Sequence, residues 1–352
     1  MPTEQDPRGR RALRLAGGVA LALAVSFGMA LPIPFLAPIF VLLLLVTNNR
    51  PLPLKAAPAL ALVIMLTTGS GLLMIPLLQH APPAGVLLVG LCLFLCFRHG
   101  LRGGNPLVTQ FLVVGLTMIS AAGTFLFPLA VTVIEALAKG MLLAVLVSLV
   151  SHALFPEPAD APAARPRPVL DASESAWIAL RAALVVLPAF LLALIDPSSY
   201  MPLIMKSVSL GQQVCGTSAR TAGRELLGST LLGGLLAILF WSALSLFPHL
   251  WMFFLWMLLF GLVLGRRLYA LAAPRQTPGF WMNTLVTLII LLGQSVQDSE
   301  SGKDVYTAFA VRMALFIAVT LYACAAVYLI DRRRFQLQRR QERAALAPEK
   351  SD

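Results

Sequence analysis

Four ionisable side chains lie inside long apolar stretches of this 352-residue chain. Glu135 and Lys139 are four residues apart, so they share one face of a helix and can form an ion pair. Lys206 and Arg312 lie in two later stretches, and Lys206 has no acidic residue close by in the sequence. An ionisable group within a membrane segment costs about 2.5–3.5 kcal/mol on insertion scales, which makes each one a functional candidate.

These charges favour an anion pathway. In this interpretation Lys206, Lys139 and Arg312 attract a substrate carboxylate, and Glu135 carries a coupling proton. The structural alternative is that Glu135 and Lys139 only lock one helix, while the other cations extend to the membrane interface. The polar residues Gln110 and Asn283 either line the same path or join neighbouring helices.

The composition defines the class of protein that must position these groups. The chain is 58% hydrophobic and only 12% charged, and its mean hydropathy is +0.83. A soluble protein is about 25% charged because its surface faces water. The apolar runs are continuous rather than alternating, which excludes a barrel of strands. We therefore predict an all-α polytopic membrane protein.

Runs of about 20 apolar residues mark the expected spans. Twelve segments fit, some of them short, at 12–30, 33–47, 54–77, 84–98, 106–122, 127–154, 177–195, 198–213, 222–246, 249–264, 278–294 and 304–331.

The distribution of basic residues orients these spans. Of the 27 lysines and arginines, all but four fall at the termini or in the even-numbered connections. Lysine and arginine accumulate on the cytoplasmic side, so both termini are predicted to be cytoplasmic. The exceptions are Lys303, in an outer connection, and the three cations within spans.

The chain reads as two similar halves. The only long polar interruption, rich in proline and alanine, is predicted to be a cytoplasmic linker. An Ala-Leu-Arg sequence ending at Arg14 opens the first half, and another ending at Arg181 opens the second. Six spans per half would make the halves parallel repeats, a recurring transporter plan. The predicted units are residues 1–154 (first repeat), 155–176 (linker), 177–331 (second repeat) and 332–352 (basic tail).

The second span of each half is short and broken. Pro34 and Pro38 interrupt the first of these segments, and Pro202 and Gly211 interrupt the second, which also holds Lys206. Interrupted segments at matching positions indicate a binding site, because irregular backbone is tolerated only around a cavity. The alternative is a short tilted helix whose lysine reaches an interface.

The sequence lacks the signatures of several other functions. There is no phosphate-binding loop of the Gly-x-x-x-x-Gly-Lys type, and the four histidines are scattered without ligand spacing. We expect no catalytic residues, no metal and no cofactor, and hence no enzyme. The net charge of +11 is explained by topology and by a basic tail that lies against anionic lipids, so nucleic acid is not expected as a partner.

One segment carries a family resemblance. At 220–237, RTAGRELLGSTLLGGLLA, the sequence resembles the fusaric acid resistance and aromatic acid exporter family. The matching positions are Arg224, Gly228, Ser229-Thr230 and Gly233. The Ala-Leu-Arg openings at Arg14 and Arg181 are similar to the same family.

The resemblance extends to a cation early in the sixth span of each half, Lys139 or Arg312. Larger members carry a substantial cytoplasmic domain between the halves, so this chain looks like a compact member.

The resemblance implies efflux of small organic or aromatic acids across a bacterial inner membrane, often with a periplasmic adaptor of the membrane-fusion type. Our leading hypothesis is proton-coupled secondary export. A passive organic-anion channel and a non-transporting subunit or membrane enzyme are the alternatives. A pathway within one chain and one shared by a homo-oligomer both stay open.

Overall fold

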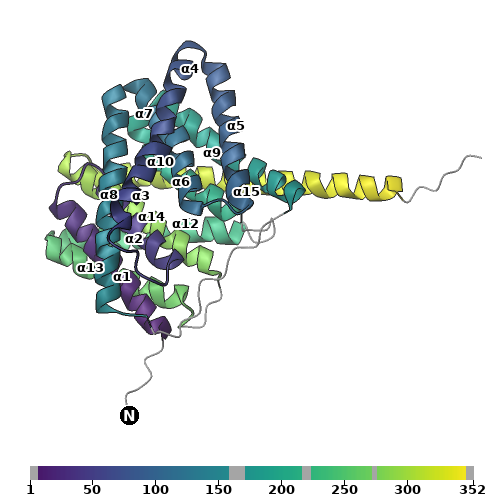
Figure 1. Cartoon of the computed structure of the whole chain (residues 1–352). Coiled ribbons are helices and arrows are strands. Elements are labelled where there is room, and N and C mark those ends of the chain that lie inside the picture. The colour runs from purple at the N-terminus through teal and green to yellow at the C-terminus, as the bar shows by residue number, and fades with distance from the viewer. Residues whose placement is uncertain (1–6, 158–170, 216–222, 272–275, 346–352) are drawn as a thin grey trace, which may run out of the picture.

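A computed structural model describes residues 7–157, 171–215, 223–271 and 276–345, and helices are the only regular elements in these ranges. Figure 1 shows them as a bundle. The helices of the first half are α1 (Pro7–Gly28), α2 (Leu36–Thr47), α3 (Ala56–Gly69), η1 (Ser70–Met74), α4 (Ile75–His80), α5 (Pro82–Leu101), α6 (Pro106–Val114), η2 (Gly115–Ile119), α7 (Ser120–Phe125) and α8 (Phe127–Leu154). Those of the second half are α9 (Ala172–Ile195), α10 (Pro197–Val214), η3 (Gly223–Leu227), α12 (Gly228–Leu246), α13 (Leu250–Leu268), α14 (Pro278–Glu300) and α15 (Val305–Ala345).

The chain is a multi-pass membrane protein by this architecture. A helix lies over each of the twelve expected segments, and ten helices in the described ranges are long and apolar enough to cross a membrane. The two that are not among these ten are α2 and α10. The prediction that these segments are broken is wrong, because α2 continues through Pro38 and α10 runs without a break through Pro202 and Gly211. With 12 residues, α2 extends about 18 Å, well below the roughly 30 Å of a bilayer core.

Helices α2 and α10 are in the interior. Nine residues of α2 are buried, and α10 packs against α6, α9, α14 and α15. Among the long spans, 72% of the α14 segment is buried, compared with 22% of the α5 segment. The bundle therefore consists of an inner group around α2, α6, α10 and α14 and an outer group that includes α5 and α13.

The two halves interlock by exchanging their first helices. In the first half, α1 packs on α13 of the second half, and α9 of the second half packs on α5 of the first. Small residues allow the α1 contact, since a Cβ on Gly261 would lie 3.2 Å from the Ala16 Cα and one on Gly265 3.4 Å from the Ala12 carbonyl oxygen. The predicted Ala-Leu-Arg openings thus begin the helices that join the halves.

The fifth spans, α6–η2–α7 and α14, begin alike. Pro106 and Pro278 are the first residues of α6 and α14, where their missing N–H is harmless. The Asn105 side chain accepts a hydrogen bond from the Leu107 N–H at 3.0 Å. The Thr277 hydroxyl accepts one from the Phe280 N–H at 3.4 Å.

The ends of the second half differ from the predicted boundaries. Helix α9 begins at Ala172, five residues before the predicted start of the second repeat, and α15 continues without a break through most of the predicted tail. Figure 1 shows the last turns of α15 projecting well beyond the bundle. Linker residues 158–170 and tail residues 346–352 lie outside the described ranges.

Candidate functional site

Lys206 is completely buried at the centre of the second half. Its Nζ donates hydrogen bonds to Asn283 Oδ1 at 2.9 Å and to Thr287 Oγ1 at 2.7 Å. All three side chains are 0% exposed. Asn283 and Thr287 are one turn apart on α14, so both point toward the same position on α10. The structure therefore joins two residues, Lys206 and Asn283, that the sequence analysis singled out separately.

The hydrogen bonds continue from α14 to the start of the third span. Asn283 Nδ2 donates to Ser229 Oγ at 2.6 Å, and the Ser229 hydroxyl donates to the Glu225 carbonyl oxygen. Thr287 donates its own hydroxyl proton to the Asn283 carbonyl oxygen at 2.7 Å. We call Lys206, Asn283, Thr287 and Ser229 the Lys206 network. Each of its polar groups has a partner, so the network fixes α10, α12 and α14 relative to one another.

The partners of Lys206 are all neutral. In the described ranges no carboxylate forms an ion pair with it, although an ammonium group removed from water is normally paired with a negative charge. Lysine has three donors, and the network uses two of them. The remaining donor and the uncompensated charge suit a carboxylate or another small anion. Because every member of the network is buried, such a ligand enters only when the surrounding helices move apart.

The backbone near the network is irregular. The third span of the second half begins as a π-helical turn, η3, whose Glu225 carbonyl oxygen is bonded by Ser229. Single π-helical turns occur frequently at functional sites. Gly233 then lets α12 approach α14, because a Cβ there would lie 2.7 Å from the Thr287 Cβ and 2.8 Å from the Thr284 carbonyl oxygen.

Of the positions that carry the family resemblance, Ser229 belongs to the network, and Gly228 and Gly233 lie beside it. Gly233 packs directly on Thr287, and a Cβ on Gly228 would lie 3.2 Å from the Phe280 ring. Arg224 is exposed at the first turn of η3. The two glycines thus set the spacing between α12 and α14, which positions Ser229 and Asn283.

The other predicted pathway residues lie apart from Lys206. Glu135 and Lys139 pair with each other at 3.0 Å on an outer face of α8, where their side chains are about half exposed. Arg312 forms an ion pair with Asp298, whose side chain is 5% exposed. Gln110 is half-buried on α6. The structure does not bring these residues together with the Lys206 network.

The arginines that open each half form equivalent ion pairs. Arg14 donates to Glu157, just after the sixth span of the first half, at 2.8 Å. Arg181 donates to Asp331, near the end of the apolar part of the sixth span of the second half, at 3.0 Å. Arg11 also pairs with Glu157. Burial opposes ionisation of Glu157, but hydrogen bonds from both arginines outweigh it and lower the pKa of this carboxyl.

The sequence analysis did not single out Thr287 or Asp298, and it noted Ser229 only for the family resemblance and not as a partner of Asn283. Serine and threonine are common in membrane helices, where they bond their own backbone, so nothing distinguished the two hydroxyl residues. Asp298 was overlooked because the predicted span ended at residue 294, whereas α14 continues to Glu300. In the described ranges no group of three or more metal-ligating side chains occurs.

Comparison with known proteins gives one partial match. No curated protein and no solved structure matches the chain. Residues 11–151, nearly the whole first half, are similar to the family described as "Protein of unknown function (DUF2955)".

Proposed function

We propose that this protein is a secondary transporter of a bacterial inner membrane that exports small organic anions, aromatic acids among them. The observation that carries the proposal is Lys206, a fully buried cation held only by the neutral oxygens of Asn283 and Thr287. Intramembrane cations of this kind mark substrate or ion pathways. An aromatic acid that enters a cell in its neutral form and ionises there requires a cationic route out.

In the proposed topology the chain crosses the membrane twelve times as two parallel six-helix repeats with cytoplasmic termini. The exchange of α1 and α9 between the halves supports this arrangement. So do the equivalent ion pairs of Arg14 and Arg181. A pathway between parallel repeats suits alternating access, in which one half moves against the other.

The site would lie on the cytoplasmic side of the bilayer centre in this topology. Asn283 is five residues from the start of α14, about 8 Å along the axis, and Lys206 is eight residues from the end of α10, about 12 Å. A cytoplasmic anion therefore has a short distance to travel before its carboxylate meets the Lys206 Nζ. The network is closed to solvent, which in the proposed cycle would be the occluded conformation.

We assign proton coupling to Asp298 rather than to Glu135. The Asp298 carboxylate is buried between α14 and α15, on the helix that also carries Asn283 and Thr287. Glu135 lies on the outside of α8. Protonation of the Asp298 carboxylate would break its ion pair with Arg312 and so alter the contact between α14 and α15. Because α14 also carries Asn283 and Thr287, this change would shift the substrate site.

Transport into inverted membrane vesicles tests the proposal. Labelled benzoate is offered with and without an acidified lumen to the wild type, to Lys206→Met and to the matched control Lys139→Met, whose lysine is exposed. We expect gradient-dependent accumulation by the wild type and the control, and a loss of at least about tenfold in Lys206→Met, because a hydrogen bond to a charged group contributes about 1.5–3 kcal/mol.

The other outcomes separate the alternatives. Benzoate that only equilibrates, whatever the gradient, identifies a passive channel. An equal loss in both lysine variants contradicts the assignment of the site to Lys206. No flux for benzoate or for other aromatic acids contradicts the transporter proposal and favours a non-transporting subunit.

A further inference from the structure

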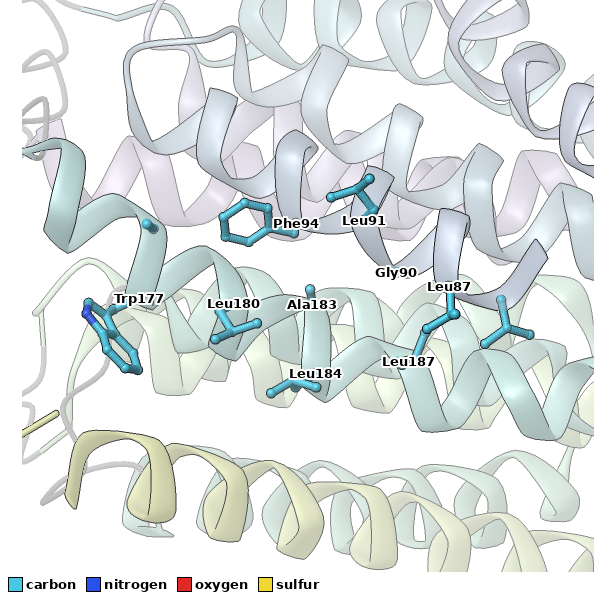
Figure 2. Close-up of a pocket in the computed structure, with 11 residues that line it drawn as sticks. Leu87, Gly90, Leu91, Phe94, Trp177, Leu180, Ala183, Leu184 and Leu187 are labelled. Carbon is cyan, nitrogen blue, oxygen red and sulfur yellow. The ribbon is translucent and has the colours of Figure 1, made fainter. Parts of the chain in front are cut away.

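An apolar groove runs along the outer surface between the two halves. It has a volume of about 530 Å³ and is formed by α5 and α9. Figure 2 shows α5, which carries Leu87, Leu91 and Phe94, running beside α9, which carries Trp177, Leu184 and Leu187. Leu87 and Leu91 are largely exposed. A lining of this kind on a membrane helix faces hydrocarbon.

A basic pocket of about 400 Å³ lies farther along α5. It is formed by Leu95, Arg98, His99 and Arg102. The Nε of Arg98 is buried without a hydrogen-bond partner. In the described ranges neither Arg98 nor Arg102 forms an ion pair. Two guanidinium groups therefore share a hollow in which the described residues place no carboxylate.

The groove and the pocket are adjacent. Helices α5 and α9 run antiparallel along the groove, so that Phe94 and Trp177 lie at one end and Leu87 and Leu187 at the other (Figure 2). Arg98 follows Phe94 by one helical turn, and Arg102 follows by a second, about 6 and 12 Å along the axis. The apolar groove thus leads past a tryptophan directly to the two arginines. This order of hydrocarbon, interfacial aromatic residue and positive charge matches the profile of one membrane leaflet.

We propose that the groove and the basic pocket together bind one anionic phospholipid. Its phosphate lies between Arg98 and Arg102, and an acyl chain lies along Leu91 and Leu187. Arginine presents planar donors that suit a phosphate, and basic residues at the end of a membrane helix attract anionic headgroups. In the proposed topology this end of α5 is cytoplasmic. Because α5 and α9 belong to different halves, the lipid joins the two halves from outside. This inference is independent of the transported substrate.

Quenching of Trp177 fluorescence by brominated lipids tests the proposal. The full-length protein is placed in phosphatidylcholine nanodiscs with increasing amounts of phosphatidylglycerol brominated on its acyl chains, and the signal of Trp177 is the difference from Trp177→Phe. We expect half-maximal quenching at a mole fraction about thirtyfold lower than with brominated phosphatidylcholine, since each basic residue near a membrane surface contributes about fivefold to anionic lipid binding.

Two variants and a control define the site. Arg98→Gln combined with Arg102→Gln should abolish the preference, whereas Arg332→Gln combined with Arg333→Gln removes the same charge from exposed positions on α15 and should preserve it. Gly90→Leu places a side chain in the middle of the groove and should reduce quenching by both lipids. If the double variant does not fold, the exposed Arg102→Gln alone should weaken the preference about fivefold.

Three results would overturn the proposal. Equal quenching of the wild type by both lipids means that ordinary bilayer lipid covers the groove. An unchanged preference in the Arg98 and Arg102 variants removes the basic pocket from the site. Displacement of the brominated phosphatidylglycerol by millimolar inorganic phosphate identifies a site for a soluble anion.

Discussion

The contact between the second and fifth spans differs between the two halves. In the first half Phe40 of α2 meets Phe111 of α6 edge to face, with ring centroids 5.4 Å apart. In the second half Lys206 of α10 meets Asn283 of α14. Phe111 and Asn283 each occupy the sixth position of helices that begin with a proline. The sixth residue of α6 therefore takes part in an aromatic contact, whereas the sixth residue of α14 holds a buried cation.

The difference suggests a division of labour between the halves. Aromatic packing stabilises the bundle without any polar group to satisfy. A buried lysine without a counter-ion is unfavourable for stability and is retained where it has a function. We infer that the first half supplies the rigid frame and the second half the substrate site. Six variants test how the two halves differ.

The largest effect on stability is expected from Phe111→Asn. It removes the ring that packs on Phe40 and buries an amide for which the surrounding apolar residues offer no partner. We expect a loss of about 3–5 kcal/mol in the free energy of unfolding, measured by chemical denaturation in detergent micelles. A loss below 1 kcal/mol would show that this contact does not support the frame.

Glu157→Gln weakens the Arg14–Glu157 ion pair of the first half, and its effect can be compared with that of the corresponding change in the second half. Arg14 is 1% exposed, so weakening its bond should cost about 1.5–3 kcal/mol. The matched change Asp331→Asn should cost less, because Asp331 is 32% exposed.

The pH dependence of the same pair follows from the lowered pKa of Glu157. Its contribution to stability is complete above the ordinary pKa near 4.5 and is lost as the pH falls through the lower folded-state value. The difference in the free energy of unfolding between the wild type and Glu157→Gln should therefore begin to shrink as the pH falls below about 4.5. It should vanish below the folded-state pKa of Glu157. A constant difference across the acidic range would contradict the pairing with the arginines.

Asn283→Ala removes the hydrogen bond between Lys206 and Asn283 in the second half. Lys206 keeps only Thr287, and the Ser229 hydroxyl loses its donor, so the free energy of unfolding should fall by about 1–3 kcal/mol. Benzoate accumulation in inverted vesicles should fall as well, because the lysine is no longer held in place. Loss of stability with unchanged transport would make Asn283 a purely structural residue.

Glu135→Gln should have the smallest effect. The pair with Lys139 is half exposed, and such pairs contribute about 0–1 kcal/mol. Gradient-driven transport should persist in Glu135→Gln and be lost in Asp298→Asn, as vesicle assays with an imposed gradient would determine. The opposite result would restore Glu135 as the proton carrier.

Local features of the sequence predicted the helices well but not their partners. Continuous apolar runs located every segment, but the prolines of α2 and α10 wrongly predicted a break, because neighbouring helices in the packed bundle support both helices across their prolines. The Glu135–Lys139 pair followed from helical spacing alone. Lys206 and Asn283 are 77 residues apart, and Arg14 and Glu157 are 143 apart, so only the packing of the helices reveals these contacts. Asp298 is only 14 residues from Arg312, and it was missed for another reason, because the predicted span ended before it.

The length of α15 has a mechanical consequence. Its 41 residues form one rod of about 60 Å, twice the thickness of the hydrocarbon core. A tilt of about 10° around its membrane-embedded end would displace the far tip by about 10 Å. A pair of distance labels, one in the bundle and one at the tip of α15, would therefore report a small tilt of this helix as a displacement large enough to measure.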